Sequence, residues 1–285
     1  MNKFLIAGIG VTGLIGGPAL AADMRPPPTP VEIFTWSGGY VGVNLGGGWR
    51  QPVDFVTAVT PCRDLLTCLL QAEETGVISG LGTRPGTRGK GITGGFQIGY
   101  NYQAGPVVVG VEADWAYFKR SSFLAGSAVR TADIGGLMSV TNEASSTWLA
   151  TVRGRLGWAW DRLLVYGTGG VAFTDLRYAQ TLSASGSVSL VVSTAVAEIT
   201  QTQTGVTVGG GVEYALWNNL SVRAEYLYAQ FKGVSVAGSL IGSGLLSTPV
   251  FRTTSNTFTG STGDLHDHIV RIGLNYKFGY VAASY

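Results

Sequence analysis

Charged residues and histidine are scarce in this chain. Only 13% of its 285 residues are charged, whereas a soluble domain carries about 25%. The formal net charge of +2 gives no basic surface for a nucleic-acid partner. Both histidines lie together, at His266 and His268, so no other histidine can complete a Ser–His–Asp arrangement. The composition therefore favours neither a nucleic-acid-binding protein nor a serine hydrolase.

The first 21 residues have the features of a secretory signal peptide. Lys3 gives a short positive start, residues 4–17 are uncharged and mostly apolar, and small residues end the segment at Ala21. The pattern G-x-G-x-x-G occurs within it, at 8–13. Prolines follow instead of a helix, so this pattern predicts no dinucleotide site. We expect export and cleavage before Ala22.

Long apolar runs are absent after the signal peptide. No later segment has 18 consecutive apolar residues, so no membrane-spanning helix is predicted. Yet the mean hydropathy is positive. An exported chain of this kind enters lipid mainly as a closed barrel, and a glycine-rich secreted sandwich is the alternative. Residues 22–34 are proline-rich and predict a stiff periplasmic tether before a barrel over 35–285.

From Trp36 onward, apolar residues alternate with polar residues or glycine, which is the spacing of β-strands. Eight such segments begin near residues 36, 92, 107, 148, 163, 206, 220 and 270. Tight turns follow the second, fourth and sixth segments, at 103–106, 161–162 and 217–219. Longer links lie at 51–89, 119–145, 175–203 and 230–267. This alternation predicts an all-β fold: an eight-stranded up-and-down antiparallel transmembrane β-barrel with long outer loops and both termini in the periplasm.

Within the third long link, residues 181–204 also alternate in polarity. They are consistent with an additional hairpin, or with the fifth and sixth strands rising beyond the bilayer. We interpret them as the rising strands.

Aromatic residues concentrate at the ends of the predicted strands, whereas the strand middles contain small and aliphatic residues. Bilayers select this arrangement because amphipathic rings are stable at headgroup level. We therefore predict two aromatic belts, which include Trp49, Trp115 and Trp148 near the long links and Trp36, Trp158, Trp160, Trp217, Tyr276 and Phe278 near the short turns.

Charged residues on the inward faces of the strands are nearly balanced in sign. Because eight strands leave a lumen barely wide enough for side chains, unpaired charges there would be costly. Glu112 and Asp114 also resemble a catalytic carboxylate pair, but a filled lumen provides no substrate cleft. We expect a structural ion-pair network of Glu112, Asp114, Arg153, Arg155, Glu213, Arg223, Glu225, Arg271 and Lys277.

Two smaller groups of residues suggest sites in the outer loops. Cys62 and Cys68 are expected to form a disulfide within one loop. His266 and His268, near Asp264 and Asp267, are weak candidates for binding a metal or haem. The alternative is that these histidines belong to a polar loop that binds no ligand, and we expect no cofactor.

Two segments of the chain resemble the small outer-membrane β-barrel proteins of alphaproteobacteria. They are WSGGYVGVNLGGGW, residues 36–49, and RIGLNYKF, residues 271–278. That family is similar in fold to the OmpA transmembrane domain and includes "porin family" surface antigens. The resemblance implies a surface-exposed role in the envelope, and some members bind haem. The chain departs from the usual ending because seven residues follow Phe278.

Three hypotheses for function follow. The leading one is a non-enzymatic structural protein of the cell surface, whose partners are outer-membrane lipid, lipopolysaccharide and the barrel-assembly machinery. The second is a porin for small solutes, although open porins need about sixteen strands. The third is a receptor that binds haem or a host ligand through its long loops.

Overall fold

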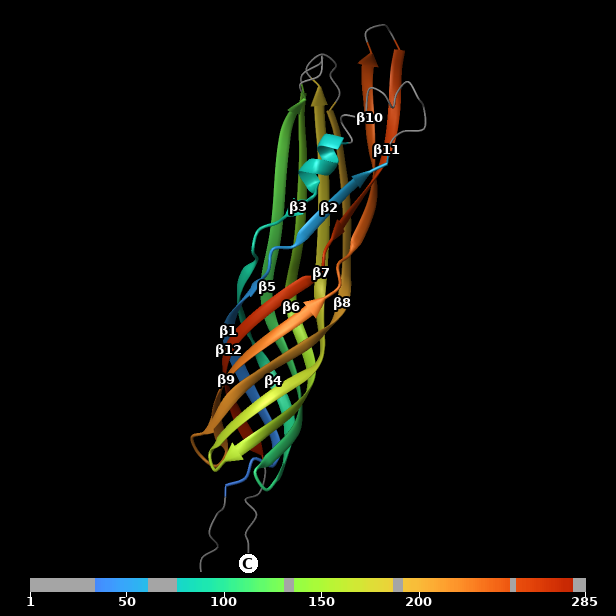
Figure 1. Ribbon diagram of the computed structural model, residues 1–285. Coiled ribbons are helices and arrows are strands. Elements are labelled where there is room, and N and C mark those ends of the chain that lie inside the picture. Colours follow the sequence, from blue (N-terminus) through green and yellow to red (C-terminus); the bar gives the residue numbers. More distant parts are fainter. Residues whose placement is uncertain (1–33, 61–75, 131–135, 187–191, 247–249, 279–285) are drawn as a thin grey trace, which may run out of the picture.

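A computed structural model describes residues 34–60, 76–130, 136–186, 192–246 and 250–278 (Figure 1). The signal peptide, nearly all of the tether, both cysteines and the tail after Phe278 lie outside these residues. The predictions made for those parts, including the Cys62–Cys68 disulfide, therefore remain predictions.

Eight strands form a closed antiparallel barrel, which confirms the predicted fold class. Around the ring the order is β1-β12-β9-β8-β7-β6-β5-β4, and β4 closes on β1. The tight turns are present; in one of them Gly105 has a φ of 60°, which glycine adopts without steric cost. The barrel strands are β1 (Gly38–Arg50), β4 (Lys90–Ala104), β5 (Val107–Arg130), β6 (Gly136–Trp160), β7 (Leu163–Gly186), β8 (Val192–Ala215), β9 (Leu220–Phe231) and β12 (Leu265–Phe278).

The alternation in the sequence sorts side chains between the lumen and the outer wall. Val43 and Leu45 of β1 are each 60% exposed, whereas Asn44 between them is 6% exposed. Successive side chains of a strand point to opposite faces, so the apolar set covers the outside. This is the orientation that a lipid-facing barrel requires.

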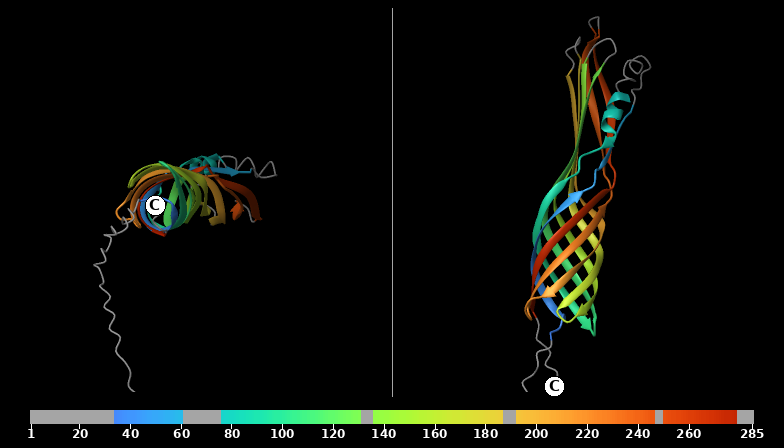
Figure 2. Two further views of the ribbon diagram at one scale, coloured as in Figure 1. Left: turned by 90° about the horizontal axis from the view of Figure 1, so that it is seen from below. Right: turned by 60° about the vertical axis from the view of Figure 1, so that its left-hand side comes forward.

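Strands β5 to β8 are 24 or 25 residues long, whereas about 9–11 residues cross a bilayer. Their outer halves continue upward beyond the ring (Figures 1 and 2). Our interpretation of 181–204 as rising strands is therefore confirmed for the described residues. The expected loop at 119–145 is wrong, because β5 and β6 extend through most of it.

The pairing register shifts where these strands leave the barrel. One irregularity lies between Tyr117 and Arg120, and another lies between Ser145 and Leu149. At the second, Asp175 of β7 accepts hydrogen bonds from the backbone nitrogen of Thr147, at 2.7 Å, and of Trp148. Bulges bend a strand and increase its twist, so these positions mark the upper end of the closed ring.

A second sheet packs against the rising strands. It has the order β10-β11-β2-β3, with β10 (Ser235–Leu246), β11 (Val250–Thr262), β2 (Asp54–Val59) and β3 (Arg84–Pro85). The expected loops at 51–89 and 230–267 thus contain strands, and residues 76–82 form a short helix. No helix in the described ranges has the length and apolar character to cross a membrane. We call the second sheet, this helix and the rising parts of β5 to β8 the head.

The head has its own apolar core between its two layers. Its buried members include Ile78, Met138, Val140, Leu182 and Phe258. A polar network beside this core also joins the layers: Gln180 donates to Asn142 at 2.8 Å and to Thr57 of β2 at 2.6 Å. Tyr178 donates to the same Asn142 oxygen, and burial raises the pKa of its phenol. The head is therefore a folded unit.

Candidate functional site

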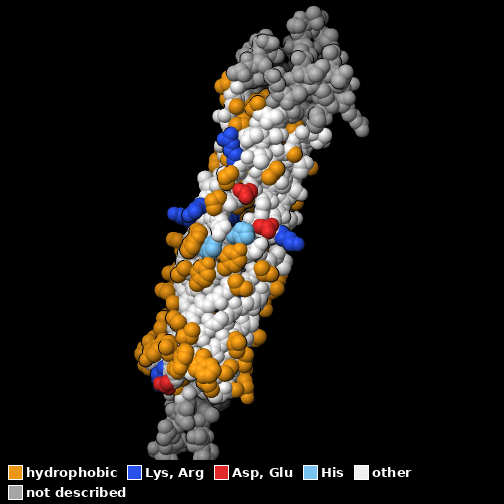
Figure 3. Space-filling view, viewed as in Figure 1, with side chains coloured by type: hydrophobic (Ala, Val, Ile, Leu, Met, Phe, Trp, Pro, Cys, Tyr) orange, Lys and Arg blue, Asp and Glu red, His pale blue; other side chains and the backbone are white. Residues whose placement is uncertain are grey.

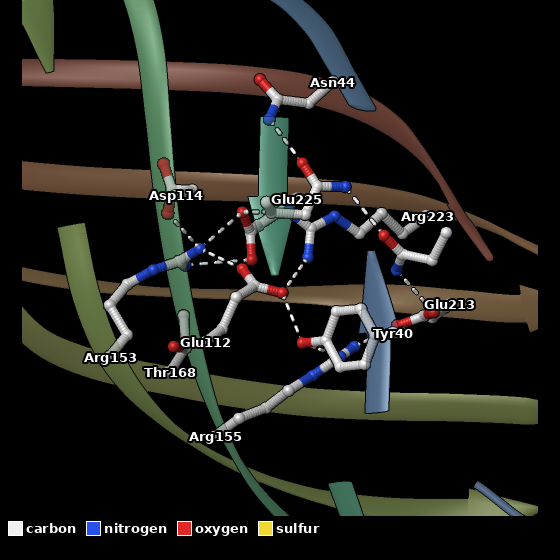
Figure 4. Close-up of polar contacts among 12 residues, drawn as sticks. Tyr40, Asn44, Glu112, Asp114, Arg153, Arg155, Thr168, Glu213, Arg223 and Glu225 are labelled. Carbon is white, nitrogen blue, oxygen red and sulfur yellow. Dashed lines mark hydrogen bonds and ion pairs between the residues drawn. The ribbon is translucent and has the colours of Figure 1, made fainter. Parts of the chain in front are cut away.

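The middle of the barrel lumen is filled by pairs of arginine and carboxylate side chains (Figure 4). Arg153 of β6 lies at the centre of this network. Its Nη2 lies 2.5 Å from Glu112 Oε1 and 3.0 Å from Asp114 Oδ2, and its Nη1 lies 3.1 Å from Glu225 Oε1. Each of the four residues is at most 5% exposed, so pairing is what makes their burial tolerable.

Two further arginines complete the surroundings of these carboxylates. Arg223 of β9 places Nη1 2.5 Å from Glu112 Oε2. Arg271 of β12 lies 2.9 Å from Asp114 Oδ1 and 2.7 Å from Glu225 Oε2. Each carboxylate therefore contacts at least two guanidinium groups, and the charges are shared across four strands of the ring.

A separate pair lies closer to the periplasmic end. Arg155 forms an ion pair with Glu213 of β8, and its guanidinium stacks 3.6 Å from the centroid of the Tyr166 ring. Glu213 also accepts hydrogen bonds from Ser221, at 2.5 Å, and Asn275, at 2.8 Å. These contacts satisfy both oxygens of the carboxylate.

Nine residues are predicted in the lumen network, and the structure brings eight of them together. They comprise four arginines and four carboxylates, so their formal charges sum to zero. Lys277 lies apart, which corrects our expectation. Its ammonium donates to the Thr35 carbonyl and lies 4.6 Å from the Phe34 ring centroid, because β12 has reached the periplasmic mouth at this position.

A second charged cluster, which the sequence analysis missed, lies nearer the outer end of the lumen. Asp267 accepts from Arg50 Nε at 2.8 Å and from Arg120 Nε at 2.8 Å. All three side chains are at most 1% exposed. Arg50 also donates to Ser146, and Arg120 donates to Thr174. The predicted long links at 119–145 and 230–267 include Arg120 and Asp267, which the structure places in β5 and β12. The period-two pattern of β5, continued past Tyr117, would have placed Arg120 inside.

The periplasmic mouth is closed by the residues that precede β1. Trp36 is 3% exposed and packs with Val108, Leu164 and Tyr166. Its indole donates to the Asp161 carbonyl at 3.1 Å. The prediction that Trp36 belongs to an aromatic belt is wrong, because the chain enters the barrel across its opening and this ring lies inside.

An apolar core surrounds the outer charged cluster and continues into the base of the head. Its buried members include Val53, Phe55, Phe118, Leu149, Leu176, Phe231 and Leu265. The lumen thus contains an aromatic plug at its periplasmic mouth, then the charge-balanced network, and then the outer charged cluster within apolar side chains.

The other predicted belt residues point outward. The side chains at the periplasmic end are between 46% and 63% exposed; they are Trp158, Trp160, Trp217, Tyr276 and Phe278. The side chains at the outer end are at most 40% exposed; they are Trp49, Trp115 and Trp148. Figure 3 shows hydrophobic side chains gathered at two levels of the barrel on the face in view. Aliphatic side chains such as Leu45 and Ile272 are exposed between the two belts. This placement agrees with amphipathic rings at the two membrane interfaces.

The two histidines lie on the outer wall of β12. His268 Nδ1 lies 2.7 Å from the Tyr226 hydroxyl, and its Nε2 lies 3.0 Å from Gln51 Nε2. His266 Nδ1 lies 2.6 Å from the Tyr228 hydroxyl. Asp267 points into the lumen instead, so it does not lie with the two histidines, as the weak candidate site for a metal or haem would require. Across the described ranges, no group of three metal-ligating side chains occurs.

Comparison with known proteins extends over nearly the whole chain. Residues 34–278 match the sequence model of the family described as the outer membrane protein beta-barrel domain. The chain is 32% identical to the 31 kDa outer-membrane immunogenic protein of Brucella melitensis, over 98% of this chain and 100% of that protein. It is 33% identical to the 22 kDa outer membrane protein of Rhizobium leguminosarum bv. viciae, over 50% of this chain and 54% of that protein.

Solved structures with a similar arrangement have far lower identity. OprG from Pseudomonas aeruginosa is 14% identical with a TM-score of 0.43, and the match covers 86% of this chain and 97% of OprG. Neisserial surface protein A is 12% identical with a TM-score of 0.35, and the match covers 85% of this chain and 98% of that protein.

Proposed function

Since the chain belongs to the family of outer-membrane protein β-barrel domains, we propose that it is a closed, non-conducting barrel that anchors a folded head at the cell surface. The barrel fixes the chain in the outer membrane, and the head is the part that meets the surroundings. The proposal assigns the chain a structural and surface role.

One observation carries the closed state: the lumen is filled along its length. The aromatic plug around Trp36, the charge-balanced network around Arg153 and the cluster around Asp267 follow one another up the barrel. An ion that entered would have to break buried pairs whose separation costs several kcal/mol. An eight-stranded ring has no room for a water-filled path beside these side chains.

Conductance in planar bilayers tests the closed state. We expect no steady single-channel currents from the purified, refolded protein. The double variant Arg155→Ala with Glu213→Ala removes one ion pair from the lumen and keeps its charge balance. We expect this variant to give only brief channel openings. Steady channels from the unaltered protein would favour the porin hypothesis instead.

The head supports the surface role. Its two layers enclose an apolar core, and it rises from the end of the barrel opposite the periplasmic turns (Figure 1). The Brucella relatives are named outer-membrane immunogenic proteins, a description that fits a protein with a large exposed part. A barrel that served only to span the membrane would not need the second sheet.

Labelling with a membrane-impermeant maleimide on intact cells tests the orientation. Val196 is 63% exposed on the head, and Asn219 is exposed in a periplasmic turn. We expect the Val196→Cys variant to be labelled on intact cells and the Asn219→Cys variant only after permeabilisation. The unaltered protein, which contains Cys62 and Cys68, measures the background. The opposite pattern would show that the head faces the periplasm.

The receptor hypothesis and an enzymatic role have less support from the side chains. The imidazole nitrogens of His268 lie beside Tyr226 and Gln51, so a haem iron would have to displace those contacts. Glu112 and Asp114 are held by arginines and are closed off from a substrate. We therefore propose that the chain is not an enzyme and needs no cofactor.

A further inference from the structure

One sector of the outer wall contains a shallow hollow beneath the outer rim. Gly47 of β1 faces outward, and Ile92 of β4 and Val270 of β12 are its partners on either side. Because Gly47 has no side chain, these neighbours border an open depression together with Trp49 and Lys90. The floor is backbone and the sides are apolar, so the hollow fits a hydrocarbon chain.

The aromatic side of the hollow is held in place. The Trp49 ring is stacked on His268, with 5.3 Å between ring centroids and 9° between planes. Tyr226 and Gln51 in turn fix the His268 ring. The depression is therefore a preformed feature of the wall, which lowers the entropy lost when a ligand binds.

Two lysines lie beside the upper end of the hollow. Lys90 of β4 is exposed and pairs in register with Trp49. Lys119 of β5 is also exposed and lies on the neighbouring strand, since backbone atoms of Lys119 are the closest to a Cβ built on Gly91. None of the ion pairs among the described residues involves either lysine, whereas the exposed Arg177 has Glu198 at 2.6 Å. Exposed lysines on neighbouring strands that form no ion pair with a described carboxylate attract an anion.

The depth of this sector in the membrane identifies the anion. Lys90, Trp49 and His268 form one continuous cross-strand row, and Trp49 belongs to the outer aromatic belt. Belts of this kind lie at headgroup level, so the lysines meet lipid phosphates while the hollow below them faces acyl chains.

We propose that this sector binds a phosphorylated glycolipid of the outer leaflet. A phosphate of the lipid accepts hydrogen bonds from Lys90 and Lys119, and one acyl chain lies over Gly47 between Ile92 and Val270. A lipid would use both the lysines and the apolar hollow, whereas a free anion would use only the lysines.

Binding is tested on the full chain in detergent, by native mass spectrometry, with bisphosphorylated lipid A as the probe. We expect the double variant Lys90→Gln with Lys119→Gln to bind about tenfold more weakly, because it loses two charge-assisted contacts. The variant Lys90→Arg with Lys119→Arg should bind like the unaltered protein. Gly47→Leu should also weaken binding, by filling the hollow.

Matched controls separate this site from general attraction. Lys232→Gln removes another exposed lysine, and Gly154→Leu fills another outward-facing glycine; neither should change the affinity. A Cβ at Gly47 or Gly154 meets only a carbonyl oxygen 3.8 Å away, so both leucine variants are expected to fold. Equal affinity for dephosphorylated lipid A, equal losses in the control variants, or competition by inorganic phosphate at the concentration of the lipid would each overturn the proposal.

Discussion

Replacing Arg153 with alanine is expected to destabilise the barrel by about 3–5 kcal/mol, the cost of breaking a buried ion-pair network by removing one partner. Glu112, Asp114 and Glu225 would each lose a contact of 3.1 Å or less. Because the lumen is packed, water is not available to take the place of the guanidinium beside these carboxylates. Urea unfolding in detergent micelles, followed by tryptophan fluorescence, measures the loss. The protein should also convert to its heat-denatured gel mobility at a lower temperature.

The matched control for this variant is Arg177→Ala. Arg177 is paired with Glu198 at 2.6 Å, but its side chain is 55% exposed. Hydrogen bonds from Arg177 lower the pKa of the Glu198 carboxyl, yet water solvates both groups once the pair is broken. We expect no measurable change in stability. If both variants unfolded at the same urea concentration as the unaltered protein, the lumen network would not contribute to stability as we describe.

Replacing Phe258 with alanine is expected to cost the head about 3–5 kcal/mol of packing energy. Phe258 of β11 is fully buried and packs with Val140 and Leu182 of the rising strands. Because the barrel has its own layers of contacts, the head should open locally while the ring stays closed. Limited proteolysis should then cut the head faster, and the gel mobility of the unheated protein should remain that of a folded barrel.

The control for this variant lies one residue further along the same strand. Thr259 is exposed, so Thr259→Ala should leave the rate of proteolysis unchanged. Loss of the folded-barrel mobility in Phe258→Ala would contradict the separation of the head from the ring. An unchanged rate of proteolysis would contradict the role of Phe258 in the core of the head.

The barrel was predictable because its signal is local. A lipid-facing strand must alternate between apolar and polar side chains, so each of the eight segments identifies itself from its own residues. The inward charges followed from the same alternation, which places Glu112, Asp114 and Arg153 on the lumen face without knowledge of their partners. The alternation does not show how far along the barrel axis a residue lies, however. For that reason Lys277 is predicted in the network, although it lies at the periplasmic mouth. Trp36 is a different case: it alternates in step with the inward residues Tyr40 and Asn44, so the same pattern would place it inside rather than in the belt.

The head was not predictable in the same way. Above the hydrocarbon layer, the outward face no longer has to be apolar; Lys119, Ser121 and Phe123 of β5 show no such pattern. The second sheet depends on pairing between β11 and β2, where Phe258 lies opposite Val59, far away in the sequence. The cluster of Arg50, Arg120 and Asp267 likewise comes from three strands. Only the fold brings these residues together.

The continuity of β5 to β8 from the ring into the head constrains how the chain can vary in length. A single inserted residue in a strand moves every later side chain to the opposite face. An insertion near residue 125 would thus carry the change along the remainder of β5, whose pairing with β6 runs to Arg130 opposite Gly136. Insertions and deletions should therefore be tolerated at the tips of the hairpins and selected against along the strands. Related chains are expected to differ in length in steps that preserve the register of the wall.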